Sequence, residues 1–105
     1  AQLLINGGCY GHWRMAPPES IAAFEQTPFD PDQALGFHRT QLAGIPAPFL
    51  GHSGFTGTWF AFSPKPGLTA VLLTNRLHRP DGQLNPALDA LRETVLRAAV
   101  TETAQ

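Results

Sequence analysis

The chain has 105 residues, 43% of them apolar, and a formal net charge of −1 at pH 7. This length fits one small domain, and the seven scattered basic residues form no positive patch of the kind that binds nucleic acid or anionic lipid. A single cysteine, Cys9, excludes an intrachain disulfide, and no apolar run approaches the roughly 18 residues of a membrane-spanning helix. The first residues contain no signal peptide, but the chain starts with Ala inside a predicted helix end. We therefore expect its natural N-terminus to lie upstream, and the compartment stays open.

The N-terminal third predicts two short helices joined by turns. Residues 1–8 have the pattern of the last turns of a helix that stops at two consecutive glycines, because glycine tolerates the left-handed conformation that caps many helices. Residues 16–28 predict a second helix, with two prolines at its start and a core-facing pair, Ile21 and Phe24. Residues 29–33, "FDPDQ", predict a loop.

The middle of the chain changes to the period of β-strands. Four candidate strands follow one another, at residues 34–42, 50–55, 57–64 and 68–75. In the third, Phe60 and Phe62 are expected on one face, and residues 59, 61 and 63 on the other. The fourth is almost continuously apolar, which predicts that both of its faces are covered. Because the connections are short, neighbouring strands are expected to be antiparallel.

A helix is predicted at the C-terminal end. Asn85 is expected to cap it with Pro86 at its first position, and Glu93 and Arg97 are spaced for an ion pair one turn apart. Its core-facing stripe is expected to comprise Leu84, Leu88, Leu91, Val95 and Ala98 or Ala99. This order of elements predicts an α+β fold, an antiparallel sheet of three to four strands flanked by helices, in one unit over residues 1–105.

The stretch "GHSGFTGTWFAFSP" at residues 51–64 carries the motif of chemical interest. Its first four residues begin like the G-x-S-x-G elbow, which holds a hydrolase nucleophile on a strand-to-helix turn. Phe55 stands where the last glycine belongs, and the residues after it alternate like a strand. Both the motif and its required context fail, so we do not predict that Ser53 is a nucleophile. A tight hairpin without a chemical role is the structural alternative for this stretch.

The four histidines do not predict a metal site. None has the HxH or HExxH spacing typical of metal ligands, and Cys9 with His12 supplies at most half of a zinc site. Gly54 and Gly57 have the spacing of a G-x-x-G nucleic-acid loop, but they lack basic neighbours. We therefore expect no metal, no cofactor and no nucleic-acid partner.

The segment "GHSGFTGTWFAFSPKPGLTAVLLTNRLHRP" closely resembles the C-terminal part of the serine β-lactamase-like family, which includes class C β-lactamases, penicillin-binding proteins and related esterases. The family's K-T-G motif, which is H-T-G or H-S-G in many esterase-like members, corresponds here to His52, Ser53 and Gly54. An aromatic strand, a strand ending near "LLTNR" and a C-terminal helix follow in the family's order, and "LLINGG", "PPESIAAF" and "ALGFH" resemble the preceding segments. The resemblance implies the C-terminal part of a β-lactamase-like (transpeptidase) fold.

The resemblance also implies a chemistry that this chain cannot perform alone. The family acts through a covalent acyl-serine, with the nucleophile in an S-x-x-K motif and a second proton-handling motif, usually Tyr-x-Asn. Neither is present: Ser20, Ser53 and Ser63 lack a lysine three positions later, and Tyr10 is followed by Gly-His. We expect the partner to be the N-terminal portion of the hydrolase, in the same or a separate chain, which carries S-x-x-K. Its strands would cover the open edge of the strand at residues 68–75.

By resemblance, the substrate-binding residues are His52, Ser53, Gly54, Phe55 and Thr56, and the catalytic ones are His52 and the Phe55 backbone. His52 takes the place of the family's lysine, where it would hydrogen-bond a tyrosine or the substrate. Ser53 would hydrogen-bond the substrate, Gly54 would let the backbone approach closely, and Thr56 would help to make the turn. The Phe55 N–H would be one oxyanion donor, and its ring would shape an acyl pocket. Because histidine titrates near neutrality, His52 favours ester or peptide-like substrates over β-lactams.

Two residues after the last predicted strand, Arg76 and His78, are candidate rim residues with a structural role as the alternative. The sequence thus predicts part of a serine hydrolase that acts on a small acyl substrate, an ester, amide or β-lactam. A catalytically inactive ligand-binding module of the same fold, or a purely structural segment, remains the alternative.

Overall fold

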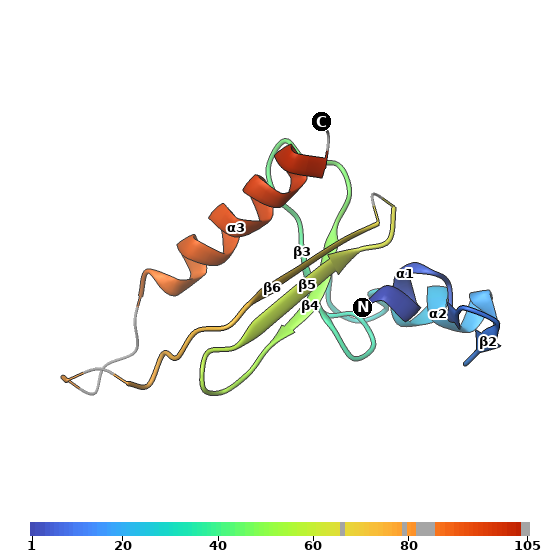
Figure 1. Cartoon of the computed structure of the whole chain (residues 1–105), viewed down its shortest axis with the longest axis horizontal. Helices are drawn as coiled ribbons and strands as arrows, with labels where there is room; N and C mark the ends of the chain where they lie inside the picture. The colour runs from blue at the N-terminus through green and yellow to red at the C-terminus, as the bar shows by residue number, and fades with distance from the viewer. Residues whose placement is uncertain (66, 79, 82–85, 104–105) are drawn as a thin grey trace.

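A computed structural model describes residues 1–65, 67–78, 80–81 and 86–103. A four-stranded antiparallel sheet forms its centre, with a long helix across one face and a small N-terminal unit on the other side (Figure 1). The strands are β3 (His38–Thr40), β4 (Phe49–Ser53), β5 (Trp59–Ser63) and β6 (Leu68–Leu72), and they lie in this order in the sheet. The predicted α+β fold with an antiparallel sheet is confirmed.

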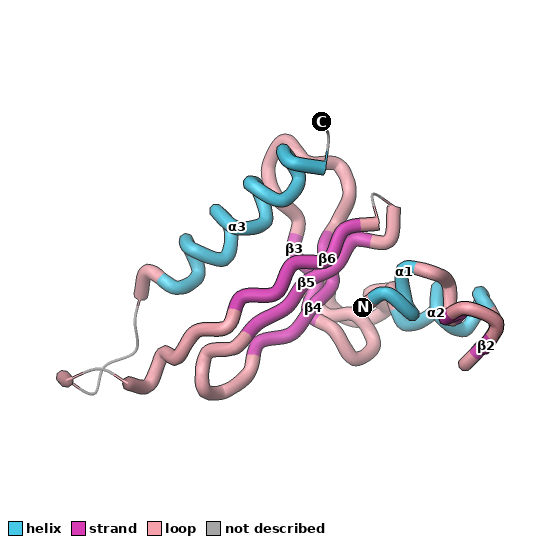
Figure 2. Tube along the Cα trace, viewed as in Figure 1, coloured by secondary structure: helices cyan, strands magenta, loops and turns pink. Residues whose placement is uncertain are grey.

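All four strands are shorter than the predicted ranges, as Figure 2 shows by its loops between and beyond them. The strand β6 was predicted to reach Asn75 but ends at Leu72, which pairs with Trp59, the first residue of β5. After this pair the backbone bonds to the β4–β5 connection: the Arg76 N–H donates to the Thr56 carbonyl oxygen at 2.8 Å. The strand β6 therefore ends at Leu72 because β5, its only described partner strand, has no residue before Trp59 with which β6 could pair.

The two faces of the sheet pack into two separate hydrophobic clusters. The cluster under the long helix contains Leu42, Phe49, Ala61, Leu68, Ala70 and Leu96, with Trp59 packed against it. The opposite cluster contains Ala34, Leu50 and Phe62, with Leu4, Ile5, Phe37 and Phe60 packed against it. The predicted alternation of Phe60 and Phe62 against Trp59 and Ala61 is confirmed. Buried Ser63 has its hydroxyl satisfied, because it donates to the Pro48 carbonyl oxygen at 2.8 Å.

The long helix, α3 (Leu88–Thr103), begins later than predicted. The expected cap Asn85 and the expected core residue Leu84 lie outside the described residues. Pro86 precedes the helix and is not its first residue. The predicted pair of Glu93 and Arg97 is confirmed, with a nitrogen–oxygen distance of 2.9 Å.

The buried face of α3 differs from the predicted stripe in two residues. Leu91 was expected in the core but is 44% exposed, whereas Leu96 was not expected there and is 2% exposed. Leu88 is buried as predicted, and Val95 and Ala99 pack against the core. The helix is rotated so that Leu96 points at the sheet, because Arg92, one turn before it, also faces inward and binds the β4–β5 connection.

The N-terminal unit combines two short helices with a hairpin. The helix α1 (Gln2–Ile5) stops as predicted, and Gly7 and Gly8 both have positive φ, 67° and 97°. The next two strands, β1 (Cys9–Tyr10) and β2 (Trp13–Arg14), form a two-residue ladder that the sequence did not predict. The helix α2 (Pro18–Phe24) buries Ile21, but Phe24 is 50% exposed, so the prediction for Phe24 is wrong. A helix of seven residues presents only about two turns, and here one apolar side chain reaches the interior.

The chain is less compact than an independent domain of its length. Its radius of gyration is 15.1 Å, against about 13 Å for a compact domain of this size. Large apolar side chains on β6 and its extension are open to solvent, with Val71 60% and Leu73 77% exposed, so the prediction that both faces of this strand are covered fails within the described residues. Of the helices that the structure describes, none has the length and apolar character needed to span a membrane.

Candidate active site

The predicted site lies on the hairpin that joins β4 to β5. Its connection begins with residues 54–57, which we call the motif turn. The Gly54 N–H donates to the Thr58 carbonyl oxygen at 2.6 Å, and the Gly57 N–H donates to the Gly54 carbonyl oxygen at 3.0 Å. Gly57 has a φ of +116°, a conformation that side chains rarely adopt. Ser53 is thus followed by a turn and a strand, which agrees with the prediction against a nucleophile elbow.

Close approach of β4 and β5 explains the glycine before the motif. A Cβ atom on Gly51 would overlap the Phe60 carbonyl oxygen and lie 2.9 Å from the Ala61 Cα atom. The residues on either side of Gly51 fall in register, with Leu50 opposite Phe62 and His52 opposite Phe60. Only glycine at position 51 therefore allows β4 to pair with β5 in the register that places His52 opposite Phe60. A Cβ on Gly54 would lie 2.5 Å from the Thr58 hydroxyl oxygen, so the Thr58 side chain would have to move to admit it.

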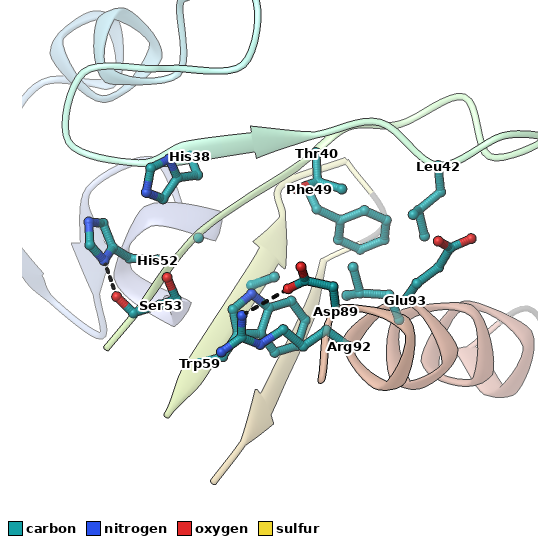
Figure 3. A pocket seen from close by; sticks show the side chains of 13 residues that line it. His38, Thr40, Leu42, Phe49, His52, Ser53, Trp59, Asp89, Arg92 and Glu93 are labelled. Atoms are coloured by element: carbon teal, nitrogen blue, oxygen red, sulfur yellow. Dashed lines mark hydrogen bonds and ion pairs between the residues drawn. The ribbon is translucent and has the colours of Figure 1, made fainter. Parts of the chain in front are cut away.

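The hydrogen bond of the His52 ring determines which of its nitrogens can accept a proton. His52 Nδ1 lies 2.7 Å from the Ser53 carbonyl oxygen (Figure 3). A carbonyl oxygen can only accept, so Nδ1 carries the proton and donates. In the neutral ring Nε2 then holds a free lone pair. His52 in this tautomer therefore offers a hydrogen-bond acceptor at Nε2.

A second histidine lies beside His52. The His38 and His52 rings have centroids 4.8 Å apart and are tilted by 36°, and Figure 3 shows them side by side on neighbouring strands. His38 on β3 is directly opposite Gly51, the residue before His52 on β4. The two rings are in contact but tilted against each other, so they are not parallel-stacked. His38 is the nearest neighbour that sequence reasoning missed, because its pairing partner depends on the register of β3.

A cavity of about 300 Å³ opens beside the motif between the sheet and α3. It is lined by His38, Thr40, Leu42, Phe49, Gly51, His52, Ser53, Trp59, Ala61, Asp89, Arg92, Glu93 and Leu96. Figure 3 shows the charged side chains on the helix side and the histidines at the other end. Arg92 Nη1 lies 3.3 Å from Asp89 Oδ1, so these two charges are paired. The half-buried Ser53 and the exposed His52 both border this cavity, and their role as a substrate-binding wall stays a prediction.

The motif turn presents an unused backbone donor. Among the residues that the structure describes, no acceptor lies within hydrogen-bond reach of the Phe55 N–H. The Phe55 ring is 75% exposed, and Thr56 is exposed as well. Arg76 contacts Phe55 directly, whereas exposed His78 has no described contact with the motif; its N–H donates to Asn75 Oδ1 at 3.0 Å. The structure thus groups His52 and Ser53 at the cavity and places Phe55 and Thr56 on the turn that follows, outside the lining of the cavity, while the chemical roles of all four remain predictions.

A second hollow, of about 370 Å³, lies at the other end of β4. Arg39, Lys65 and Glu25 contribute its charged lining. Burial raises the pKa of the Glu25 carboxyl above its ordinary value of 4.5. Within the described parts of the chain, no three histidine, cysteine or acidic side chains are grouped to hold a metal ion.

Comparison with known proteins finds one matching family and a set of similar proteins. The family described as Beta-lactamase matches residues 11–94. Proteins of Salmonella paratyphi B, Salmonella newport and Salmonella heidelberg, each named "Putative D-alanyl-D-alanine carboxypeptidase", are 30% identical to the chain over 96 residues. The match covers 81% of this chain and 22% of each relative, so the chain spans about a fifth of their length. No solved structure matches the chain significantly.

Proposed function

The chain belongs to the Beta-lactamase family of serine hydrolases, and on that premise we propose that it forms one wall of an acyl-serine site in a longer hydrolase. The observation that carries the proposal is the Phe55 N–H, which has no partner in the part of the chain that the structure describes and follows directly after His52 and Ser53, two residues that border a cavity. An unpaired backbone N–H next to a concave site is the kind of donor that stabilises an oxyanion.

The proposed reaction needs a serine from outside these residues. That serine oxygen would bond to the carbonyl carbon of an ester, amide or β-lactam, the bond to the leaving group would break, and the serine proton would pass to the leaving group. Water would then cleave the acyl-serine. In both steps the Phe55 N–H would donate to the carbonyl oxygen as it becomes negative. His52 Nε2 would accept a hydrogen bond from a tyrosine or the substrate, and the Ser53 hydroxyl would bind the substrate.

We propose that the partner of this chain is the N-terminal portion of the same hydrolase, carrying S-x-x-K. Three observations support a missing portion: the short coverage of the relatives, the large radius of gyration and the solvent-exposed Val71 and Leu73 beside the motif. A hollow of about 340 Å³, lined by His52, Ser53, Gly54, Thr58, Trp59, Phe60, Val71 and Leu73, lies on that side of the motif. An apolar strand of this kind is expected to be covered in the complete protein.

A fluorescent acyl-serine probe tests the proposal on the longer protein that includes this chain. We expect the label on a serine outside residues 1–105, with labelling retained in a Ser53→Ala variant. The name of the relatives makes a peptide ending in D-alanyl-D-alanine the first substrate to try, with release of D-alanine as the readout. A label mapped to Ser53 would overturn the assignment of the nucleophile. Binding of the substrate without any acyl-enzyme would support the alternative, an inactive ligand-binding or structural module.

A further inference from the structure

The motif turn is held by groups from two segments that are distant in the sequence. The Gly57 carbonyl oxygen accepts from the Thr74 hydroxyl at 2.8 Å and from Arg92 Nη2 at 3.2 Å. Thr74 follows β6, and Arg92 lies on α3. A Cβ atom on Gly57 would come within 2.7 Å of the Arg76 backbone nitrogen, which shows how closely the segment after β6 packs against the turn. The turn is therefore fixed from the side that faces away from β4.

Arg76 makes the largest number of distinct contacts with this turn. Its backbone N–H donates to the Thr56 carbonyl oxygen at 2.8 Å, and its Nε donates to the Phe55 carbonyl oxygen at 2.5 Å. Its guanidinium carbon also lies 5.3 Å from the centroid of the Phe55 ring, within the range of a cation–π contact. One side chain thus holds both the carbonyl group and the ring of Phe55.

These contacts determine where the Phe55 N–H points. The Cα atom of Phe55 is tetrahedral and has one handedness, so holding its carbonyl group and its ring restricts the positions that its nitrogen can take. The Gly54–Phe55 peptide is planar and trans, so its N–H points opposite to the Gly54 carbonyl oxygen. That oxygen accepts from the Gly57 N–H inside the turn. The Phe55 N–H must therefore point out of the turn, where it has no described acceptor.

We propose that Arg76 is a positioning residue, which aims the Phe55 N–H at the oxyanion of the reacting acyl group. The inference rests on the proposed function. Arg76 lies 21 residues after Phe55. Among the described residues, no other side chain is seen to bind both the carbonyl oxygen and the ring of Phe55. A misdirected donor weakens an interaction that is strongest in the transition state, so its loss lowers kcat more than it raises KM.

Two conservative variants separate the hydrogen bond from the charge. In Arg76→Gln, the side-chain amide can occupy the place of Nε and donate to the Phe55 carbonyl oxygen, but the charge is lost. In Arg76→Lys, the charge is kept over the ring, but the donor at the Nε position is lost. If positioning depends on the hydrogen bond, Arg76→Gln retains more activity than Arg76→Lys, and Arg76→Ala retains least.

The experiment compares these variants in the longer protein, with acylation by the fluorescent probe and hydrolysis of a nitrophenyl ester as readouts. For Arg76→Ala we expect kcat to fall about tenfold to a hundredfold, less than the loss of a whole oxyanion donor, with KM changed by less than about twofold. Arg97→Ala is the matched control, because Arg97 also donates to a loop carbonyl, that of Ala43, but far from the motif turn. It should leave kcat unchanged.

A second readout does not depend on catalysis. Hydrogen exchange of the Gly57 amide, which is bonded within the motif turn, should become faster in Arg76→Ala and remain slow in Arg76→Gln. Failure of the wild-type protein to acylate would overturn the proposed function. Hydrogen exchange of the Gly57 amide would still show whether Arg76 holds the motif turn in place. An active wild type with unchanged kcat in Arg76→Ala overturns the inference. A rise in KM alone, limited to substrates with a carboxylate, would show that Arg76 binds substrate and would also overturn it.

Discussion

The sheet with α3, residues 38–103, and the N-terminal unit, residues 1–33, bury their apolar side chains to very different extents. In the first, Phe49, Phe62 and Leu96 are 2% exposed or less. In the second, Trp13 is 60% exposed and Phe29 is 93% exposed. Covering of these aromatic side chains by another segment of the longer hydrolase is part of the proposal above, and singly exposed apolar residues by themselves are common on protein surfaces. The motif-bearing part therefore has a core of its own, whereas the N-terminal unit is stabilised by few contacts within this chain.

The largest effects should separate these two regions. Leu96→Ala should lower the free energy of unfolding by about 2–5 kcal/mol, because it leaves a cavity between α3 and the sheet. Phe29→Ala should change it by less than about 0.5 kcal/mol in the 105-residue chain. Denaturant unfolding of both variants gives the two values. Equal losses would contradict the difference in burial between the two regions. A loss for Phe29→Ala that is seen only in the longer protein would show that the rest of that protein covers Phe29.

The next effect concerns the spacing of β4 and β5. Gly51→Ala should cost about 1–3 kcal/mol, because its Cβ would overlap the backbone of β5. Gly36→Ala is the control, since Gly36 has open space around its Cβ position but a φ of +94°. It should cost about 1–2 kcal/mol from backbone strain alone and leave the spectrum of the Trp59 side chain unchanged. A Gly51→Ala protein with native stability would show that the strands can separate without cost.

A smaller effect is expected at the site itself. In the longer protein, His52→Ala should lower kcat/KM for a nitrophenyl ester by about tenfold or more, about 1.4 kcal/mol, because the acceptor at Nε2 is lost. His12→Ala, on an exposed residue between β1 and β2, serves as the control and should leave the value unchanged. An unchanged value for His52→Ala would remove His52 from the site.

The smallest effect tests the pH dependence of Glu25. Because burial raises its pKa in the fold, the folded state binds the proton more tightly than the unfolded state, and stability falls as the pH rises through the ordinary value of 4.5. Glu25→Gln removes this loss, so its advantage in melting temperature should grow between pH 4 and pH 7. Glu19→Gln, on an exposed residue of α2, is the matched variant and should show no such growth.

How far the sequence predicts this molecule is best judged on α3 and the motif. Alternation in β5 and the glycines after α1 predicted local structure correctly, because each depends on neighbours in the chain. The buried face of α3 was misjudged because Arg92, a charged residue, occupies it and binds the Gly57 carbonyl oxygen, a contact made across 35 residues. Likewise, no local signal places His38 beside His52, because strand register is decided by the whole sheet. The motif residues were identified by resemblance, and their contacts required the fold.

The bond between Arg92 and Gly57 also has a consequence for the order in which the molecule is made. On the ribosome the hairpin with the motif is synthesised 35 residues before Arg92. Domains begin to fold as the chain emerges, so β4 and β5 can pair while α3 does not yet exist. During that interval the Gly57 carbonyl oxygen lacks its partner on the helix, and Leu96 is absent from the core. The motif turn therefore reaches its final form only when α3 has been translated and has docked on the sheet.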